Sequence, residues 1–347
     1  MQSRTLPELL CLSFQDRRPE FVSAPRRAVG VATVCGRVRV GAGAQLCAGS
    51  VIRGDGHEVR IGDDFFMGER STIRVAHEHL PTLIGTGVTL GSRCALRACR
   101  IGDRVVLEDE VVVLDGAVVG AGSVLERGCL VPAGADLPAG YLYRGNPAVA
   151  VRALEAGELS LLRGRVRNAP SQEPAAGAPP PLGPVWPGFV ALTAHVDGQL
   201  RIDREASIWF GARVDGGHHG VHLGEGSNLQ DNSSAYAMAS PLEIGVGVTV
   251  GHNVSLQDCR IGDHSLIGPA SFVAAGTVVE TDVILAPGSV TRPRQVLHSG
   301  WMWGGRPARP LEPMDAQGRA VVEKSARVHR DYLHAFRQAI ADYSELG

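Results

Sequence analysis

The sequence of 347 residues has few aromatic side chains, no long hydrophobic run and almost no net charge. Aromatic residues make up 5% of the chain, whereas glycine accounts for 44 residues, which suits a narrow aliphatic core with frequent tight turns. The formal net charge of −2 gives no basis for a nucleic-acid or membrane partner. No stretch approaches the roughly 20 apolar residues of a membrane-spanning helix. Residues 1–27 carry several charges and no long apolar segment, so we expect no signal peptide.

The chain also lacks any Cys-x-x-Cys pair among its seven cysteines. An odd number of cysteines without paired spacing predicts free thiols in a reducing compartment, and hence a cytoplasmic protein. Cys99 and Cys259 each come directly before an Arg-Ile-Gly-Asp segment. We expect both to be small apolar residues that face the core, and the alternative is a reactive thiol.

What the sequence does contain is an aliphatic residue at every sixth position over two long stretches. A period of six fits neither an amphipathic helix nor an alternating strand over such a length. It is typical of a hexapeptide solenoid, in which each coil has three short parallel strands around a triangular aliphatic core. The positions are Ile101, Leu107, Val113, Val119, Leu125 and Val131 in the first stretch, and Ile261, Ile267, Val273, Val279 and Leu285 in the second.

Two segments of the first half recur 160 residues later. Gly87-Val-Thr-Leu-Gly91 and Arg100-Ile-Gly-Asp103 return as Gly247-Val-Thr-Val-Gly251 and Arg260-Ile-Gly-Asp263. The chain therefore contains one solenoid unit twice, which predicts an all-β protein with two tandem β-helices. We expect an N-terminal extension at 1–30, a first β-helix domain at 31–166 with a helical segment at 149–166, a Pro- and Ala-rich linker at 167–187, and a second domain at 188–347 with an amphipathic helix at 321–346.

Several short motifs follow one another in order along each half. They are Ser50-Val-Ile-Arg-Gly-Asp55, Gly87-Val-Thr-Leu-Gly91 and Tyr141-Leu-Tyr-Arg-Gly-Asn-Pro147 in the first half, and Ser207-Ile-Trp209, Asn228-Leu-Gln-Asp231 and Gly247-Val-Thr-Val-Gly-His252 in the second. With these motifs both halves resemble the γ-class carbonic anhydrase family. The resemblance implies left-handed β-helices that assemble as trimers and hydrate carbon dioxide at a zinc or iron ion between subunits. In the family three histidines hold the metal, which brings the pKa of bound water to about 7.

Carried over to the first half, the three histidine positions of the family hold Arg74, Ser92 and Arg97. None of these side chains can bind zinc there, and two arginines bring positive charge to the place of the cation. The family's Gln-Asp pair is replaced by Gly68-Glu69, whereas Arg53-Gly-Asp55 matches a pair that the resemblance assigns to the subunit interface. We therefore expect that the first half has lost the metal site.

In the second half the same three positions hold Tyr236, His252 and Gln257. One imidazole, one phenol and one amide make a poor zinc site, because the phenol and the amide are weak neutral oxygen donors. Gln230 and Asp231 match the residues that orient the reacting water in the family. This half thus keeps one of the three ligands, and we expect no bound cofactor, with zinc or iron as the alternative.

Two other groups of histidines suggest a metal. His57, His77 and His79 form a conceivable displaced site in the first half, although loop histidines are usually solvated. His218 and His219 would point to opposite sides of an extended segment. We therefore favour a polar turn over a metal site for the run that ends at His222.

These residues suggest functions of different classes. The favoured hypothesis is a metal-independent enzyme, in which His252 is the base, Tyr236 is the acid or orienting donor, Asp231 fixes the imidazole tautomer, and Gln230 and Gln257 complete the cluster. Such a cluster supports cyclisation, hydration, elimination or isomerisation of a small molecule, the chemistry of a lyase or isomerase. The alternatives are a catalytically silent assembly subunit, a metal-dependent carbonic anhydrase, and acyl transfer from coenzyme A, which rests on fold analogy alone.

The fold class also predicts the assembly. A left-handed solenoid presents a flat face that neighbours normally cover around a threefold axis. We therefore expect a homotrimer with pockets between neighbouring second domains. In such a pocket His252 of one chain faces Tyr236 and Gln257 of the next.

Overall fold

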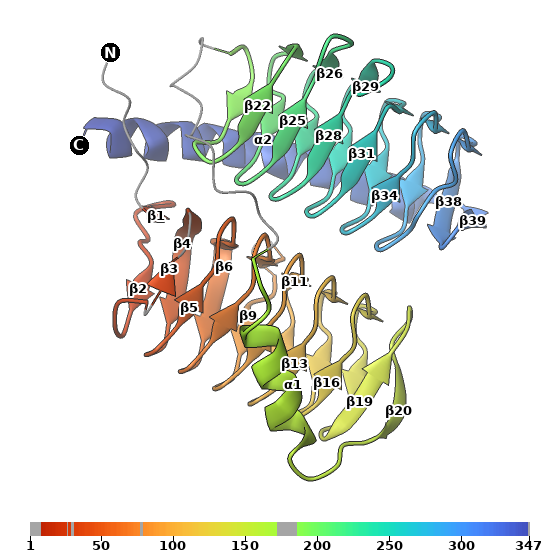
Figure 1. The fold of residues 1–347 in the computed structure, drawn as a ribbon. Coiled ribbons are helices and arrows are strands. Elements are labelled where there is room, and N and C mark those ends of the chain that lie inside the picture. The colour runs from red at the N-terminus through yellow and green to blue at the C-terminus, as the bar shows by residue number, and fades with distance from the viewer. Residues whose placement is uncertain (1–7, 26, 29–30, 77–78, 172–185, 346–347) are drawn as a thin grey trace. The chain divides into compact units, whose positions relative to one another are not determined.

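The computed structural model describes residues 8–25, 27–28, 31–76, 79–171 and 186–345. The chain divides into two compact units, an N-terminal unit within Thr5–Ala178 and a C-terminal unit within Pro179–Gly347. Each unit is a left-handed parallel β-helix whose short strands stack coil upon coil (Figure 1). The predicted linker at 167–187 lies largely outside the described residues.

The described residues of the N-terminal unit form twenty strands and one helix. Its strands form a 12-stranded sheet, in which the long strands β4 and β6 continue around a corner of the coil, and an 8-stranded sheet. The elements are β1 (Leu9–Leu12), β2 (Glu20–Phe21), β3 (Arg27–Ala28), β4 (Ala32–Val40), β5 (Gln45–Leu46), β6 (Val51–Ile61), β7 (Phe66–Met67), β8 (Thr72–Arg74), β9 (Thr82–Ile84), β10 (Thr89–Leu90), β11 (Ala95–Arg97), β12 (Arg100–Ile101), β13 (Val106–Leu107), β14 (Val112–Val113), β15 (Val118–Val119), β16 (Val124–Leu125), β17 (Leu130–Val131), β18 (Asp136–Leu137), β19 (Tyr141–Arg144), β20 (Val149–Ala153) and α1 (Glu158–Arg167).

The C-terminal unit forms three separate sheets, of eight, five and six strands, and ends in a long helix. The elements are β21 (Phe189–Val190), β22 (His195–Asp197), β23 (Leu200–Ile202), β24 (Ser207–Ile208), β25 (Arg213–Asp215), β26 (Val221–Leu223), β27 (Asn228–Leu229), β28 (Ser234–Tyr236), β29 (Leu242–Ile244), β30 (Thr249–Val250), β31 (Ser255–Gln257), β32 (Arg260–Ile261), β33 (Leu266–Ile267), β34 (Phe272–Val273), β35 (Val278–Val279), β36 (Ile284–Leu285), β37 (Val296–Leu297), β38 (Trp301–Gly305), β39 (Ala308–Pro313) and α2 (Ala316–Glu345).

The strand register confirms the prediction of three hexads per coil. Ile101 pairs with Val119 of the next coil, and Ile261 pairs with Val279, so equivalent residues are 18 positions apart. Because the side chains of these residues stack in columns inside the helix, one aliphatic residue per hexad is enough to fill the core. Gly87 adopts a φ of 71° at a turn, a conformation that glycine adopts without the steric penalty of a side chain.

The two aliphatic cores include the cysteines that precede the Arg-Ile-Gly-Asp segments. Cys99 and Cys259 are each 3% exposed and belong to the buried clusters of their own units. This confirms that they are small apolar core residues. Burial raises the pKa of the Cys99 thiol strongly and that of Cys259 to about 12, which keeps both in the unreactive thiol form.

Ellman's reagent should therefore distinguish the seven free cysteines by burial. Cys11 is exposed and Cys47 is partly exposed, whereas the other five side chains are buried. We expect at most two thiols to react with the folded protein, and all seven to react in denaturant. A Cys11→Ser/Cys47→Ser variant should be nearly silent until it unfolds, and rapid labelling of Cys99 or Cys259 in the folded protein would contradict their assignment to the core.

The segment before residue 31 differs from the prediction of an N-terminal extension. Strand β1 pairs in parallel with β4, and the Leu10, Leu12 and Phe14 side chains are buried. Strand β2 also pairs with β4, and β3 pairs with β5. The described residues before 31 are therefore part of the N-terminal β-helix, although they lack the six-residue spacing.

The predicted helical segment at 149–166 is helical only in its second half. Residues 149–153 form β20, which pairs in antiparallel fashion with β19 at the end of the coil stack. Helix α1 then packs Leu159, Leu162 and Val166 against the β-helix, and Arg167 forms an ion pair with Asp64 at 3.0 Å. The antiparallel pairing satisfies backbone hydrogen-bonding groups of the last coil. This stabilisation outweighs the helical propensity of residues 149–153.

The predicted C-terminal helix is confirmed and is slightly longer than expected. Helix α2 begins at Ala316 and packs Phe336 against Trp209 and Phe210, with ring centroids 5.5 Å apart in both pairs. Among the described residues, no helix is both long enough and apolar enough to span a membrane.

Candidate functional site

Asp231 and His252 occupy the same corner of consecutive coils in the C-terminal unit. This corner joins the sheet of β27 and β30 to the sheet of β28 and β31. The N–H of Asn253 donates to the carbonyl of Asp231, and the N–H of Ala270 donates to that of His252, both at 3.0 Å. The predicted neighbours Asp231 and His252 therefore lie on adjacent coils, one above the other.

The polar groups at this corner are buried and partly engaged within the unit. Gln230, Asp231 and His252 are 5%, 0% and 2% exposed. One carboxylate oxygen of Asp231 accepts the N–H of Phe210 at 3.2 Å, and the Gln230 amide donates to the Asn228 side chain at 3.1 Å. These bonds hold the side chains of Asp231 and Gln230 in defined orientations.

Tyr236 and Gln257 form a second group, at the other end of the same strands. They are the last residues of β28 and β31 and pair directly across the sheet. Each lies five residues beyond the corner residue of its own coil, after a turn and a three-residue strand. The C-terminal unit therefore places Asp231 with His252 at the corner before β28 and β31, and Tyr236 with Gln257 at the end of these strands.

The N-terminal unit places its replacement residues at equivalent positions. The carbonyls of Glu69 and Ser92 accept the N–H groups of the residues at the next corner, each at 2.8 Å, as those of Asp231 and His252 do in the other unit. Arg74 pairs with Arg97 across adjacent strands, as Tyr236 pairs with Gln257. Ser92 therefore stands where the C-terminal unit has His252.

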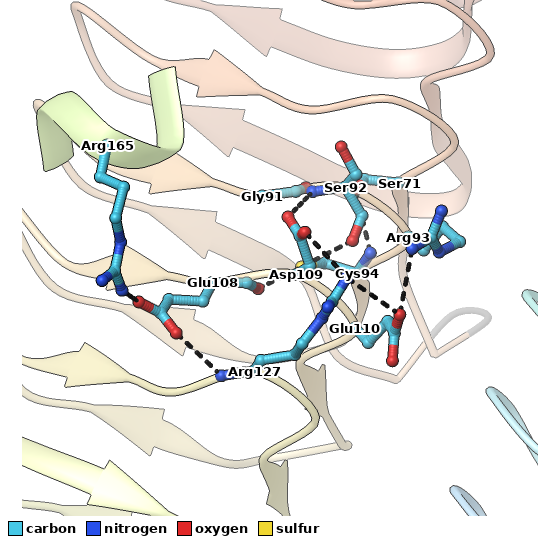
Figure 2. Close-up of polar contacts among 10 residues, drawn as sticks. All are labelled: Ser71, Gly91, Ser92, Arg93, Cys94, Glu108, Asp109, Glu110, Arg127 and Arg165. Carbon is cyan, nitrogen blue, oxygen red and sulfur yellow. Dashed lines mark hydrogen bonds and ion pairs between the residues drawn. The ribbon is translucent and has the colours of Figure 1, made fainter. Parts of the chain in front are cut away.

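Internal ion pairs close this corner of the N-terminal unit (Figure 2). The Asp109 carboxylate accepts the N–H of Ser92 at 2.9 Å and contacts Arg127 at 3.2 Å. Glu110 contacts Arg127 at 3.5 Å and Arg93 at 3.0 Å. The two carboxylates and the two guanidinium groups around Ser92 thus neutralise one another within the unit.

The donor sets at the family's ligand positions do not fit zinc in either unit. Arg74 lies 3.7 Å from Asp55, and Arg97 lies 3.2 Å from Asp115, so both positions carry guanidinium groups that are already paired with carboxylates. In the other unit the three positions hold one imidazole, one phenol and one amide, and the last two are weak neutral oxygen donors. Within the described ranges no three His, Cys, Asp or Glu side chains are grouped to hold a metal ion.

Of the other candidate histidines, His57 and His222 have local partners, and His79 is exposed. His57 accepts the N–H of Glu58 at 2.8 Å, and His77 lies outside the described residues. His222 bonds to Asp203 at 2.9 Å, and this contact lowers the pKa of the Asp203 carboxyl. His222 is therefore paired with a carboxylate at a distance typical of a charge-assisted hydrogen bond.

Comparison with known proteins places this architecture in a family. Over 139 residues the chain is 33% identical to protein YrdA of Escherichia coli, and the match covers 38% of this chain and 76% of YrdA. The chain belongs to the γ-carbonic-anhydrase-like family. It is 37% identical over 154 residues to γ carbonic anhydrase 1 of Arabidopsis thaliana, a mitochondrial protein, with 42% of this chain and 56% of the plant protein covered.

This γ-carbonic-anhydrase-like chain spans about half the length of the plant relatives that it matches. No family profile matches the chain. A putative acetyltransferase structure from Desulfovibrio desulfuricans has a TM-score of 0.53, is 13% identical, and covers 92% of this chain and 79% of its own. That likeness shows the fold alone. Because some relatives are mitochondrial by name, the cytoplasmic location stays a prediction.

Proposed function

We propose that this protein is a γ-carbonic-anhydrase-like homotrimer that performs metal-independent acid–base chemistry on a small molecule. The supporting observation is that Asp231 and His252 stand at the corner before β28 and β31, whereas Tyr236 and Gln257 are the last residues of these strands. Two half-sites at opposite ends of the same strands are what a pocket between copies requires, because each copy then contributes one half-site. The three positions matched to the family's ligands would meet only between neighbouring chains.

In this proposal His252 is the general base and Tyr236 is the acid, or the donor that polarises a carbonyl group. Asp231 orients the imidazole from the adjacent coil, while Gln230 and Gln257 position the substrate by hydrogen bonds. Removal of a proton by the imidazole and donation of a proton by the phenol would carry out a hydration, elimination, cyclisation or isomerisation. No step requires a cation.

Metal analysis of the purified protein, together with an activity screen, tests the proposal. We expect substoichiometric zinc and iron, and no hydration of carbon dioxide before or after loading with either metal. A panel of β-hydroxy and α,β-unsaturated carbonyl compounds should contain at least one that is turned over. Near-stoichiometric metal combined with carbon dioxide hydration would instead establish a carbonic anhydrase, and sedimentation as a monomer would exclude the shared pocket.

An assembly subunit without catalysis is the second candidate. Two observations favour it. Gln230 and Asp231 form hydrogen bonds within their own unit, and Asp109 and Arg127 form an ion pair near Ser92 in the N-terminal unit. Both sets of contacts stabilise the solenoid without a substrate. If His252→Ala abolished binding to a partner protein but no panel compound were turned over by the wild type, this function would replace the first. Turnover of a coenzyme A thioester would point to acyl transfer.

A further inference from the structure

One carboxylate holds a loop of the C-terminal unit, residues 237–241, which directly follows Tyr236. A single oxygen of Asp258 accepts the backbone N–H groups of Met238, Ala239 and Ser240, at 2.7, 2.9 and 3.2 Å. Hydrogen bonds to an ionised acceptor are roughly twice as strong as those between neutral groups. The position of this loop therefore depends on the Asp258 side chain.

The backbone of Asp258 is also joined to the pair formed by Tyr236 and Gln257. Asp258 follows Gln257 in the sequence, and its N–H donates to the carbonyl of Tyr236 at 2.9 Å. Its φ of 42° lies in the left-handed region, which aspartate adopts more readily than most other side chains. Asp258 thus connects the Tyr236–Gln257 pair and the loop.

The N-terminal unit provides an internal comparison. Ala98 occupies the equivalent place, since its N–H donates to the carbonyl of Arg74 at 2.9 Å and its φ is 46°. The backbone geometry is therefore retained, but a methyl group cannot accept hydrogen bonds from a loop. Of the two units, the C-terminal one has a carboxylate at this place. It is also the unit in which Tyr236 and Gln257 occupy positions matched to metal ligands of the family.

We propose that Asp258 is a positioning residue for the C-terminal site, which holds the loop and, through it, the Tyr236 phenol. This inference rests on the proposed function. The Met238 side chain of this loop is 68% exposed, and Met238 follows Tyr236 by two residues in the sequence. A fixed loop therefore adds an apolar surface to this end of the site, which suits a neutral substrate with an apolar part better than a small inorganic anion such as bicarbonate.

Two substitutions separate the carboxylate from the backbone conformation. Asp258→Gly removes the acceptor but permits a positive φ, whereas Asp258→Asn keeps an acceptor oxygen and tolerates that φ. In the full chain we expect hydrogen exchange at Met238, Ala239 and Ser240 to accelerate about 10- to 100-fold in the glycine variant, because the amides lose their acceptor. The asparagine variant should restore slow exchange in part, because its neutral oxygen still accepts hydrogen bonds but weaker ones.

Asp263→Gly is the matched control. Its carboxylate also accepts a backbone N–H, that of Val246 at 2.8 Å, but at a different corner of the coil. We expect exchange in the 238–240 loop to stay at the wild-type rate in this variant. If hydrogen exchange in this loop accelerated equally in both glycine variants, the cause would be a general loss of stability. That result would overturn the proposal.

The phenol is observed separately by fluorine NMR of the full chain labelled with 3-fluorotyrosine. The chain has five tyrosines, and Tyr236→Phe assigns the resonance of interest. We expect this resonance to shift in Asp258→Gly and to return in Asp258→Asn. An unchanged Tyr236 resonance in the glycine variant would overturn the positioning role. Neither measurement needs a substrate, so the result is independent of whether the proposed activity is found.

Discussion

Replacing Asp55 with alanine is expected to lower the free energy of unfolding by about 3–5 kcal/mol, because it leaves buried guanidinium groups without their carboxylate. The Arg53 and Asp55 side chains are 0% and 1% exposed and form an ion pair. Arg74, which is 7% exposed, lies 3.7 Å from the same carboxylate. Urea denaturation followed by far-UV circular dichroism measures the change.

Glu58→Ala is the matched control for this substitution, because Glu58 lies on the same strand, β6, and forms an ion pair with Arg60 at 2.9 Å. The Arg60 side chain is 64% exposed, so this pair should contribute about 1 kcal/mol or less. Equal effects of the two substitutions would show that the buried cluster is not needed for stability. Replacing Arg53, Asp55 and Arg74 together by apolar residues should cost less than Asp55→Ala alone.

Replacing His252 with alanine is expected to lower the turnover of any compound identified in the activity screen by about 10²- to 10⁴-fold, which is the usual contribution of a general base. The trimer should persist, as judged by sedimentation. His264→Ala is the control, since His264 is an exposed histidine of the same unit. Loss of the trimer together with activity would assign His252 a structural role instead.

Mixing two inactive variants tests whether the site is shared between chains. His252→Ala removes the base, and Tyr236→Phe removes the phenol from the other half-site. In trimers refolded from an equal mixture, about a quarter of the interfaces should combine an intact His252 with an intact Tyr236 from the next chain. Recovery of about a quarter of the wild-type activity would support a shared pocket, and a mixture as inactive as its components would refute it.

The fold was largely predictable because its core repeats. Ile101 and Val119 contact each other one coil apart, and this contact is encoded by an 18-residue spacing that is visible in the sequence. The segment with Leu10 and Leu12 escaped prediction because it pairs with β4 without the hexad spacing. Residues 149–153 were predicted to be helical because local composition carries no information about the antiparallel pairing with β19.

The site was less predictable than the fold. The resemblance to the family predicted that Asp231 orients the imidazole of His252, and the structure places the two residues at the same corner of adjacent coils. It gave no indication that Asp258 would engage three amides of a loop 18 to 20 residues earlier in the chain. The only signal in the sequence was the difference between Asp258 and Ala98 at equivalent positions of the two halves.

The sequence by itself determined the two β-helices, because each inward aliphatic side chain needs only its equivalents on neighbouring coils, and the six-residue period places them there. The tertiary structure alone decided the arrangement of the outward polar groups. Whether a carboxylate such as Asp109 pairs with an arginine, or one such as Asp258 holds a loop, depends on which corners and strand ends the coils bring together. Asp109 and Asp258 have no counterpart in the other half of the chain, where Pro269 and Ala98 take their places, so their partners cannot be obtained from the repeat.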